Sequence, residues 1–385
     1  MFEILDDKMV NLMIRLSSEC RNNIGDSDFF EIDMRELFNL CKEHELEGVV
    51  ASHILEDNLC ELPNYWKEEY LKEKERLEFF KTKSKQICAE MKKNKIPMII
   101  LKNGGIMNDI VHDVAACPME DVDSFIQKEN FMKAHDILLK NGFEFRFRSE
   151  YEKEDLKEAF ADGATEYYIV MPNGEKMWFE LSYRAIAGRW IRPDKEPDTE
   201  ELFSRLYYAE HTDVGILSPE DNLLQVCVHT AKHSYVRSPG LRLHLDVERI
   251  VRYKEINWEL FVERVKQAHV KTSTYYSLLI PKVLFDTPVP ESVLAELEPA
   301  KRKKQRIESL LCKVGLLYPQ KAKFSKMQFL FFQTSLYDSI WDIWKVIFPS
   351  ILWYKNRYAM RSIIQLPYLM IFRMLDLVGI RKKKK

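Results

Sequence analysis

Glycine is scarce in this chain, with 12 residues among 385, whereas proteins contain on average about 7% glycine. Few positions can therefore adopt left-handed turns, which favours a mostly helical protein and excludes a collagen-like one. The seven cysteines are odd in number, widely spread and never form a C-x-x-C pair. This pattern is typical of reduced thiols in a cytosolic protein, and it argues against a disulfide-rich miniprotein or a structural zinc knuckle.

Long apolar runs are missing as well. The best candidate, Leu366 to Ile380, is interrupted by Arg373 and Asp376, whereas a membrane-spanning helix needs about 18–20 apolar residues. The sequence MFEILDDKMV at the N-terminus is acidic, and a signal peptide would begin with basic residues and continue with apolar ones. We therefore expect a cytoplasmic protein that does not cross a membrane.

Positive charge is concentrated in the last part of the chain. Residues 320–385 contain thirteen Lys and Arg, three Asp and Glu and 13 aromatic residues, so they carry +10 and residues 1–319 carry −12. Basic and aromatic residues together indicate a membrane surface, a nucleic-acid groove or a helical core with a cationic rim. Nucleic acid is disfavoured, because phosphate contacts need clustered Lys and Arg and most of the chain is acidic. We expect aromatic residues such as Phe331, Phe332, Trp341 and Trp344 to pack inward, with peripheral membrane contact through 320–385 as the alternative.

The apolar periodicity divides the chain into four regions. Residues 1–96 form a helical region that ends in one long helix from Asn64 to about Lys95. Residues 97–195 form an α/β core, 196–319 a helical domain, and 320–385 a basic, aromatic helical segment. The fold class is α+β, dominated by helices, with a small mixed β-sheet between helical N-terminal and C-terminal regions.

Strands and helices alternate in the α/β core. Short apolar runs predict strands at 97–101, 122–126 and 143–147, and TEYYIVM, PNGE and KMWFELSY predict a β-hairpin. Helices are expected at about 103–112 and 131–139, and beyond Pro197 at about 219–234, 241–253, 257–268, 272–286 and 290–313.

Three acidic residues in this core suggest metal chemistry. Asp121 and Asp123 flank Val122 at the start of a predicted strand, so the period of two places both carboxylates on one face. Glu180 lies on the second strand of the hairpin, with Trp178 and Ser182 on its face. Carboxylate oxygens are the ligands that Mg²⁺ prefers, and two-metal nucleotidyl transfer needs several of them.

A glycine-containing segment lies between the first strand and the helix that follows it. The segment Lys102-Asn103-Gly104-Gly105 would let backbone N–H groups and the helix N-terminus approach a phosphate. Arg184 follows Glu180 closely and is a further candidate for phosphate binding. The pair His229 and His233, four residues apart on a helix, lacks the glutamate of H-E-x-x-H. We therefore expect one of the two histidines at a domain interface, near a bound nucleotide, rather than both on zinc.

The segments LKNGGI, PMEDVDSFI, MWFELSYR, LSPEDNLLQVCVHTAKH and RLHLDVERI resemble the uncharacterised nucleotidyltransferase family within the DNA polymerase β-like superfamily. The resemblance covers about residues 95–300. It implies transfer of NMP from an NTP to an acceptor hydroxyl, phosphate or protein side chain, with release of pyrophosphate and with Mg²⁺ or Mn²⁺ as cofactor. Asp121 and Asp123 would bind the metal, with Glu180 as third carboxylate and general base. Gly104 and Gly105 would cradle the triphosphate, and Lys102 would neutralise a phosphate.

Four residues depart from the family pattern. Asn103 and Glu120 stand where the family has glycine, Cys117 where it has arginine, and Ser182 where it has histidine. An arginine offers a bidentate contact to phosphate that cysteine cannot replace. These departures and the basic tail leave a second hypothesis open: a catalytically decayed nucleotide-binding or scaffold protein that docks on a membrane-associated assembly through its tail.

Overall fold

The chain divides into two compact units, and each unit combines three segments that are distant in the sequence. The first unit comprises residues 1–83, 102–119 and 217–338, and the second comprises 84–101, 120–216 and 339–385. The structure is a computed structural model. It describes residues 7–21, 24–148, 155–184, 191, 193–233, 235, 240–317, 324–358 and 360–377.

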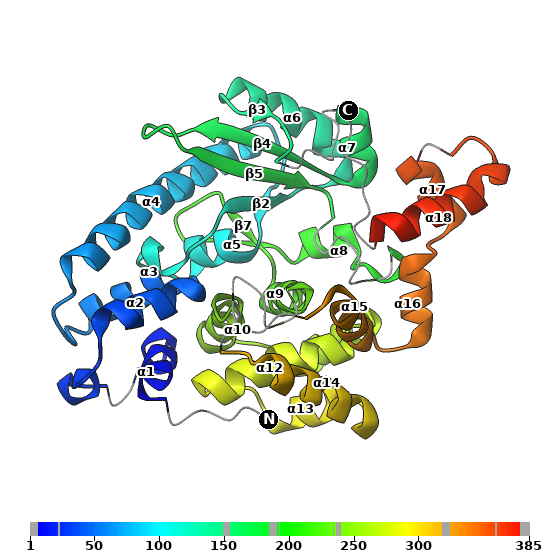
Figure 1. The fold of residues 1–385 in the computed structure, drawn as a ribbon. Helices are drawn as coiled ribbons and strands as arrows, with labels where there is room; N and C mark the ends of the chain where they lie inside the picture. The colour runs from blue at the N-terminus through cyan, green and yellow to red at the C-terminus, as the bar shows by residue number, and fades with distance from the viewer. Residues whose placement is uncertain are drawn as a thin grey trace. The chain divides into compact units, whose positions relative to one another are not determined.

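Helices make up the first unit (Figure 1). They are α1 (Lys8–Ser17), α2 (Met34–Glu43), α3 (Glu47–Glu56), most of α4 (Asn64–Lys93), α5 (Lys102–Asp109), α9 (Pro219–Lys232), α10 (Arg242–Tyr253), α11 (Trp258–Gln267), α12 (Lys271–Phe285), α13 (Glu291–Leu297), α14 (Lys301–Val314) and α15 (Lys326–Ser335). Around α9 pack α10, α11 and α12, while α1 and α2 pack with α3.

The long helix α4 confirms the predicted stripe. Trp66, Leu77, Phe80, Ile87 and Met91 are all fully buried, as expected for apolar residues that recur at helical spacing. The indole Nε1 of Trp66 donates to the backbone oxygen of Glu47 at 2.9 Å, so the helix is held at its N-terminal end by a hydrogen bond as well as by burial.

Local signals also set the ends of other helices. At α9 the side chain of Ser218 accepts from the backbone N–H of Asp221, and Pro219 occupies the first turn, as the sequence predicts. The helix predicted over 290–313 is instead two helices, α13 and α14, separated at residues 298–300. Pro299 explains the break, because proline cannot donate to the preceding turn and disfavours helical backbone in the residue before it.

A seven-stranded mixed sheet lies in the second unit, with strand order β3-β4-β5-β2-β1-β7-β6 (Figure 1). The strands are β1 (Ile99–Ile100), β2 (Asp121–Phe125), β3 (Glu144–Phe145), β4 (Ala164–Val170), β5 (Lys176–Ser182), β6 (Tyr207–Tyr208) and β7 (Gly215–Ile216). The first five confirm the predicted strands. The last two were missed, because a two-residue strand has no periodicity to detect.

One face of this sheet is apolar and is covered by α6 (Phe131–Lys140). Met177, Phe179 and Leu181 of β5 are fully buried. The Phe179 ring lies 5.4 Å from that of Phe143, and Nδ1 of His135 on α6 lies 2.8 Å from the hydroxyl of Tyr167 on β4. Side chains alternate along a strand, so the residues between these project from the opposite face.

The remaining helices of the second unit are α7 (Leu156–Asp162), α8 (Thr199–Ser204), α16 (Ile340–Ile347), α17 (Ile351–Tyr358) and α18 (Leu366–Leu377). Within the described ranges, no helix has both the length and the apolar character needed to cross a bilayer. The many helices and the single mixed sheet confirm the helix-dominated α+β class.

The aromatic residues near the C-terminus are less buried than the sequence predicts. Phe332 on α15 is fully buried, but Phe331 is 50% exposed, Trp341 66% and Trp344 52%. The expectation of inward packing is therefore wrong for these three residues. A short helix can bury only one stripe of side chains. Where aromatic residues are consecutive or closely spaced, some of them therefore lie on the exposed side of the helix.

A close backbone approach at Gly48 gives a test of the helical unit. A Cβ atom at Gly48 would lie 2.4 Å from the backbone oxygen of Ala115, which cannot move aside as a side chain would. Overpacking typically costs about 1–3 kcal/mol, so we expect Gly48→Ala to lower the free energy of unfolding by about 2 kcal/mol in denaturant titrations. Gly25 has open space around its would-be Cβ, and Gly25→Ala should change stability by less than about 0.5 kcal/mol. Equal stability of the two variants would contradict the packing.

Candidate active site

Three adjacent strands bring carboxylates side by side on the sheet face opposite to α6. The register pairs Asp123 of β2 with Glu180 of β5, and Glu180 in turn with Glu166 of β4. Directly paired residues project from the same face, and neighbouring strands lie about 4.8 Å apart. Asp121 lies two residues before Asp123 on this face. We call Asp121, Asp123, Glu166 and Glu180 the acidic row.

The structure therefore brings the three predicted carboxylates together and adds Glu166, which the sequence analysis missed. The sequence could have shown this residue. If the two strands of the hairpin are paired outward from the PNGE turn, Glu166 stands opposite Glu180. Asp123 is buried, and the other three are partly exposed. Four carboxylates at such spacing repel one another, so the row attracts cations.

Arg148 supplies one cation to the acidic row. Its Nη2 donates to Asp121 and lies 3.3 Å from Oε1 of Glu166, while its backbone N–H donates to Oε2 of Glu166 at 2.6 Å. The guanidinium also lies over the ring of Trp178, at 5.6 Å from the centroid. Burial alone would lower the pKa of Arg148, but the charges of Asp121 and Glu166 outweigh it and raise that pKa. This contact could not be predicted from the sequence, because Arg148 lies outside any periodic segment.

The donor chemistry of the acidic row suits a hard divalent cation. All its donors are carboxylate oxygens, the ligands that Mg²⁺ and Mn²⁺ prefer. Among the residues that the structure describes, however, no three His, Cys, Asp or Glu side chains converge closely enough to hold a metal ion. The strand register places the carboxylates at adjacent positions, and Arg148 binds both Asp121 and Glu166.

The predicted phosphate segment belongs to the first unit and is helical. Lys102, Gly104 and Gly105 all lie in the first turn of α5, which starts at Lys102. The left-handed residue is Lys102, with φ of 52°, rather than either glycine. The helix predicted from about Asn103 is confirmed, and both glycines lie within its first turn. Backbone N–H groups of a first turn lack partners inside the helix, so the segment keeps the property for which it was singled out.

Basic side chains gather around His229 in the helical unit, and Lys102 is one of them. Both α9 and α10 pack against α5. His229 and His233 on α9 have ring centroids 5.0 Å apart. Burial, followed by the charges of Lys102, His233, Lys232 and Arg242, lowers the pKa of His229 well below 6.5. The five residues Lys102, His229, Lys232, His233 and Arg242 form what we call the basic cluster. His229 thus lies near Lys102 of the predicted phosphate segment.

Two of the departures from the family pattern form part of the structure around α5. The carbonyl of Pro118 accepts hydrogen bonds from Nδ2 of Asn103, at 2.7 Å, and from Nη1 of Arg242. The Cys117 thiol donates to the backbone oxygen of Asn103 at 3.3 Å. Burial raises the pKa of Cys117 to about 12, so this thiol stays protonated and is no nucleophile.

Of the other two departures from the family pattern, Ser182 is buried and Glu120 is exposed. Ser182 is buried, and its hydroxyl donates to the backbone oxygens of Gly163 and Arg184, at 3.1 and 2.9 Å. It therefore secures the end of β5. Glu120 is exposed at the residue before β2.

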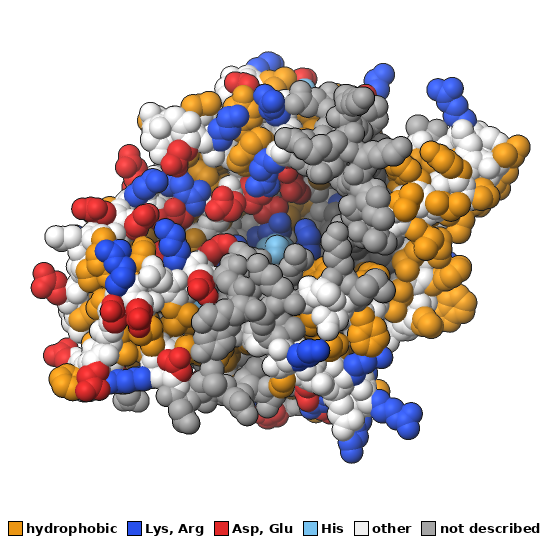
Figure 2. Space-filling model, in the orientation of Figure 1, with side chains coloured by type: hydrophobic (Ala, Val, Ile, Leu, Met, Phe, Trp, Pro, Cys, Tyr) orange, Lys and Arg blue, Asp and Glu red, His pale blue; other side chains and the backbone are white. Residues whose placement is uncertain are grey.

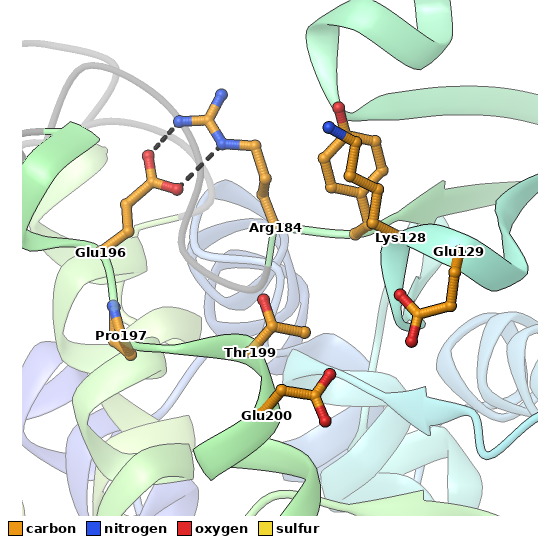
Figure 3. A pocket seen from close by; sticks show the side chains of 8 residues that line it. Lys128, Glu129, Arg184, Glu196, Pro197, Thr199 and Glu200 are labelled. Atoms are coloured by element: carbon orange, nitrogen blue, oxygen red, sulfur yellow. Dashed lines mark hydrogen bonds and ion pairs between the residues drawn. The ribbon is translucent and has the colours of Figure 1, made fainter.

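Arg184 lines a separate pocket of about 400 Å³ in the second unit (Figure 3). Its Nε and Nη2 donate to the carboxylate of Glu196, with Nε at 2.9 Å. Lys128, Glu129 and Glu200 also line this pocket, and none of the acidic row does. The structure thus does not bring Arg184 together with the predicted metal ligands.

A family model described as uncharacterised nucleotidyltransferase matches residues 31–286. The chain belongs to this family. No curated protein matches the sequence. The matched range contains the acidic row, Arg148 and the basic cluster, so the nucleotidyltransferase assignment covers both groups of candidate residues.

The coupling between Lys102 and His229 tests the basic cluster in this nucleotidyltransferase. Lys102→Gln removes a positive charge beside the imidazole, so the pKa of His229 should rise towards its ordinary value. NMR titration of the histidine resonances measures this change. Lys266 on α11 is exposed and paired with Glu296, so Lys266→Gln should leave the resonance of His229 unchanged. An unchanged titration in Lys102→Gln would contradict the proximity of α5 and α9.

Proposed function

We propose that this family member is a Mg²⁺- or Mn²⁺-dependent nucleotidyltransferase that moves NMP from an NTP to an acceptor and releases pyrophosphate. The observation that carries the proposal is the strand register that aligns Asp123, Glu180 and Glu166 beside Asp121. Family membership supplies the reaction class, and the aligned carboxylates suit the cation that such a reaction uses. The acceptor is a hydroxyl, a phosphate or a protein side chain.

Asp121 and Asp123 would hold the metal ions, with Glu180 as the third ligand. The ions would lower the pKa of an acceptor hydroxyl and neutralise the triphosphate. Glu180 is also the candidate for accepting the acceptor's proton, as its carboxylate lies on the same face. A bond forms between the acceptor oxygen and the α-phosphorus while the α–β phosphoanhydride bond breaks, and pyrophosphate takes the electron pair.

We assign the triphosphate to Lys102, Gly104 and Gly105, with the charge of Lys232 on α9 in support. Anions favour a helix N-terminus with nearby cations, and α5 has both. We leave Arg184 out of this assignment, because Glu196 already accepts from two of its nitrogens.

Binding of the four NTPs tests the metal ligands. Calorimetry in the presence of Mg²⁺ or Mn²⁺ should show metal-dependent binding of at least one NTP by the wild type. The double variant Asp121→Asn/Asp123→Asn should lose at least about 100-fold in affinity, because outer-shell partners alone typically contribute about 10- to 100-fold. Asp213 is an exposed aspartate that pairs with Lys92, and Asp213→Asn should bind like the wild type. Equal affinity in the double variant would contradict the assignment.

Arg148 provides a second, independent test. Its guanidinium competes with a divalent cation for Asp121 and Glu166, so Arg148→Gln should strengthen metal binding in the absence of nucleotide. A partly exposed charge pair contributes up to about 1 kcal/mol, which corresponds to about a fivefold change in Kd for Mn²⁺. The control is Arg205→Gln, since Arg205 pairs with Glu201 on an exposed surface. Weaker Mn²⁺ binding in Arg148→Gln would show that Arg148 is not a competitor.

The same ion pair favours one alternative function. Arg148 already neutralises Asp121. A protein that binds nucleotides without catalysis needs no metal ion at Asp121, so it could keep this ion pair. Under that alternative, NTPs bind with the same affinity whether or not a divalent ion is present. Single-turnover assays with labelled NTP then show no pyrophosphate from wild type or from Arg148→Gln.

A further inference from the structure

The last three helices of the second unit expose many large apolar side chains. Orange side chains gather on the right of Figure 2, where Figure 1 draws α16, α17 and α18. The large apolar residues exposed here, which we call the tail surface, are Ile340, Trp341, Trp344, Ile351, Ile363, Ile364, Tyr368, Ile371, Phe372, Met374 and Leu375. Monomeric proteins rarely expose contiguous apolar patches of this kind unless the patch binds something.

The tail surface is not a consequence of loose packing. Helix α18 packs against both α16 and α17, and α17 packs against α7. Tyr354 and Met360 are buried on the inner side of these helices, and the rings of Tyr358 and Phe372 meet edge to face at 5.7 Å. The helices therefore have an inner apolar side that is satisfied and an outer apolar side that is not.

Positive charge accompanies the exposed apolar residues. Residues 339–385 contain ten Lys and Arg and two Asp and Glu, a net charge of +8. Of the two acids, Asp342 is buried and accepts from Ser339 in a capping box, which removes its charge from the surface. Lys345, Lys355 and Arg361 are exposed. Five of these ten cations are the RKKKK at the end of the sequence.

We propose that the tail surface binds peripherally to an anionic lipid bilayer. Short amphipathic helices that expose Trp, Tyr, Phe and Ile beside Lys and Arg lie in the interface of a membrane, where the apolar side chains enter the headgroup boundary. Each cation near an anionic leaflet adds to the attraction. A second copy of the chain fits the surface less well, because two surfaces of the same positive charge repel each other.

Co-flotation of the full chain with vesicles tests this proposal. Vesicles of phosphatidylcholine with phosphatidylserine should bind the wild type at about 0.05 M salt and release most of it at about 0.5 M, because salt screens the charges. Vesicles of phosphatidylcholine alone should bind it at least about tenfold less. Failure to bind phosphatidylserine vesicles at any salt concentration overturns the proposal.

Two variants separate the apolar and the charged contributions. Trp341→Ser/Trp344→Ser should weaken binding at least about tenfold, since each buried aromatic ring contributes strongly at an interface. Lys345→Gln/Lys355→Gln/Arg361→Gln should also weaken it about tenfold or more and reduce its salt dependence. Phe30 is 70% exposed in the first unit, so Phe30→Ser is the matched control and should bind like the wild type.

Thermal stability and oligomeric state serve as the controls. All the substituted positions are exposed, so circular dichroism melts should match the wild type within about 2–4 °C. Analytical ultracentrifugation without lipid should show a monomer. A wild-type dimer that Trp341→Ser/Trp344→Ser dissociates, together with vesicle binding unaffected by that variant, would overturn the proposal in favour of a self-association surface.

Discussion

The parallel pairing of β2 with β5, and the antiparallel pairing of β5 with β4, is the constraint on which the candidate site depends. Since side chains alternate along a strand, the same register that buries Phe179 beneath α6 aligns Asp123, Glu180 and Glu166 on the other face. A slip by one residue would expose the apolar side chains and bury the carboxylates. The hydrophobic core of the sheet therefore holds the acidic row in place, and the repulsion within the row is opposed by the packing of the opposite face.

Charge is distributed unevenly between the two units. The sheet unit carries four aligned carboxylates with Arg148, whereas the helical unit holds Lys102 in a basic cluster around His229. The chain passes from β1 directly into α5, so a single connection links the strand beside β2 to the segment that carries Lys102.

The departures from the family pattern become intelligible once their contacts are known. Asn103 and Cys117 belong to a local network in which the Pro118 carbonyl and the Asn103 carbonyl are acceptors. Ser182 secures the end of β5 through backbone oxygens. An arginine is absent at position 117, but Arg148 reaches the acidic row from a different part of the chain. A missing family residue therefore does not by itself remove the corresponding charge.

The sequence by itself determined the helix-dominated α+β class, the first five strands, the helices α4 to α6 and α9 to α12, and three members of the acidic row. These features depend on local periodicity, capping and turn residues, which act over a few residues. Tertiary structure alone decided the pairing of Arg148 with Asp121, the pairing of Arg184 with Glu196, the short strands β6 and β7, and the exposure of Trp341 and Trp344. Such features depend on contacts between segments that are distant in the chain, and the composition of neither segment specifies its partner.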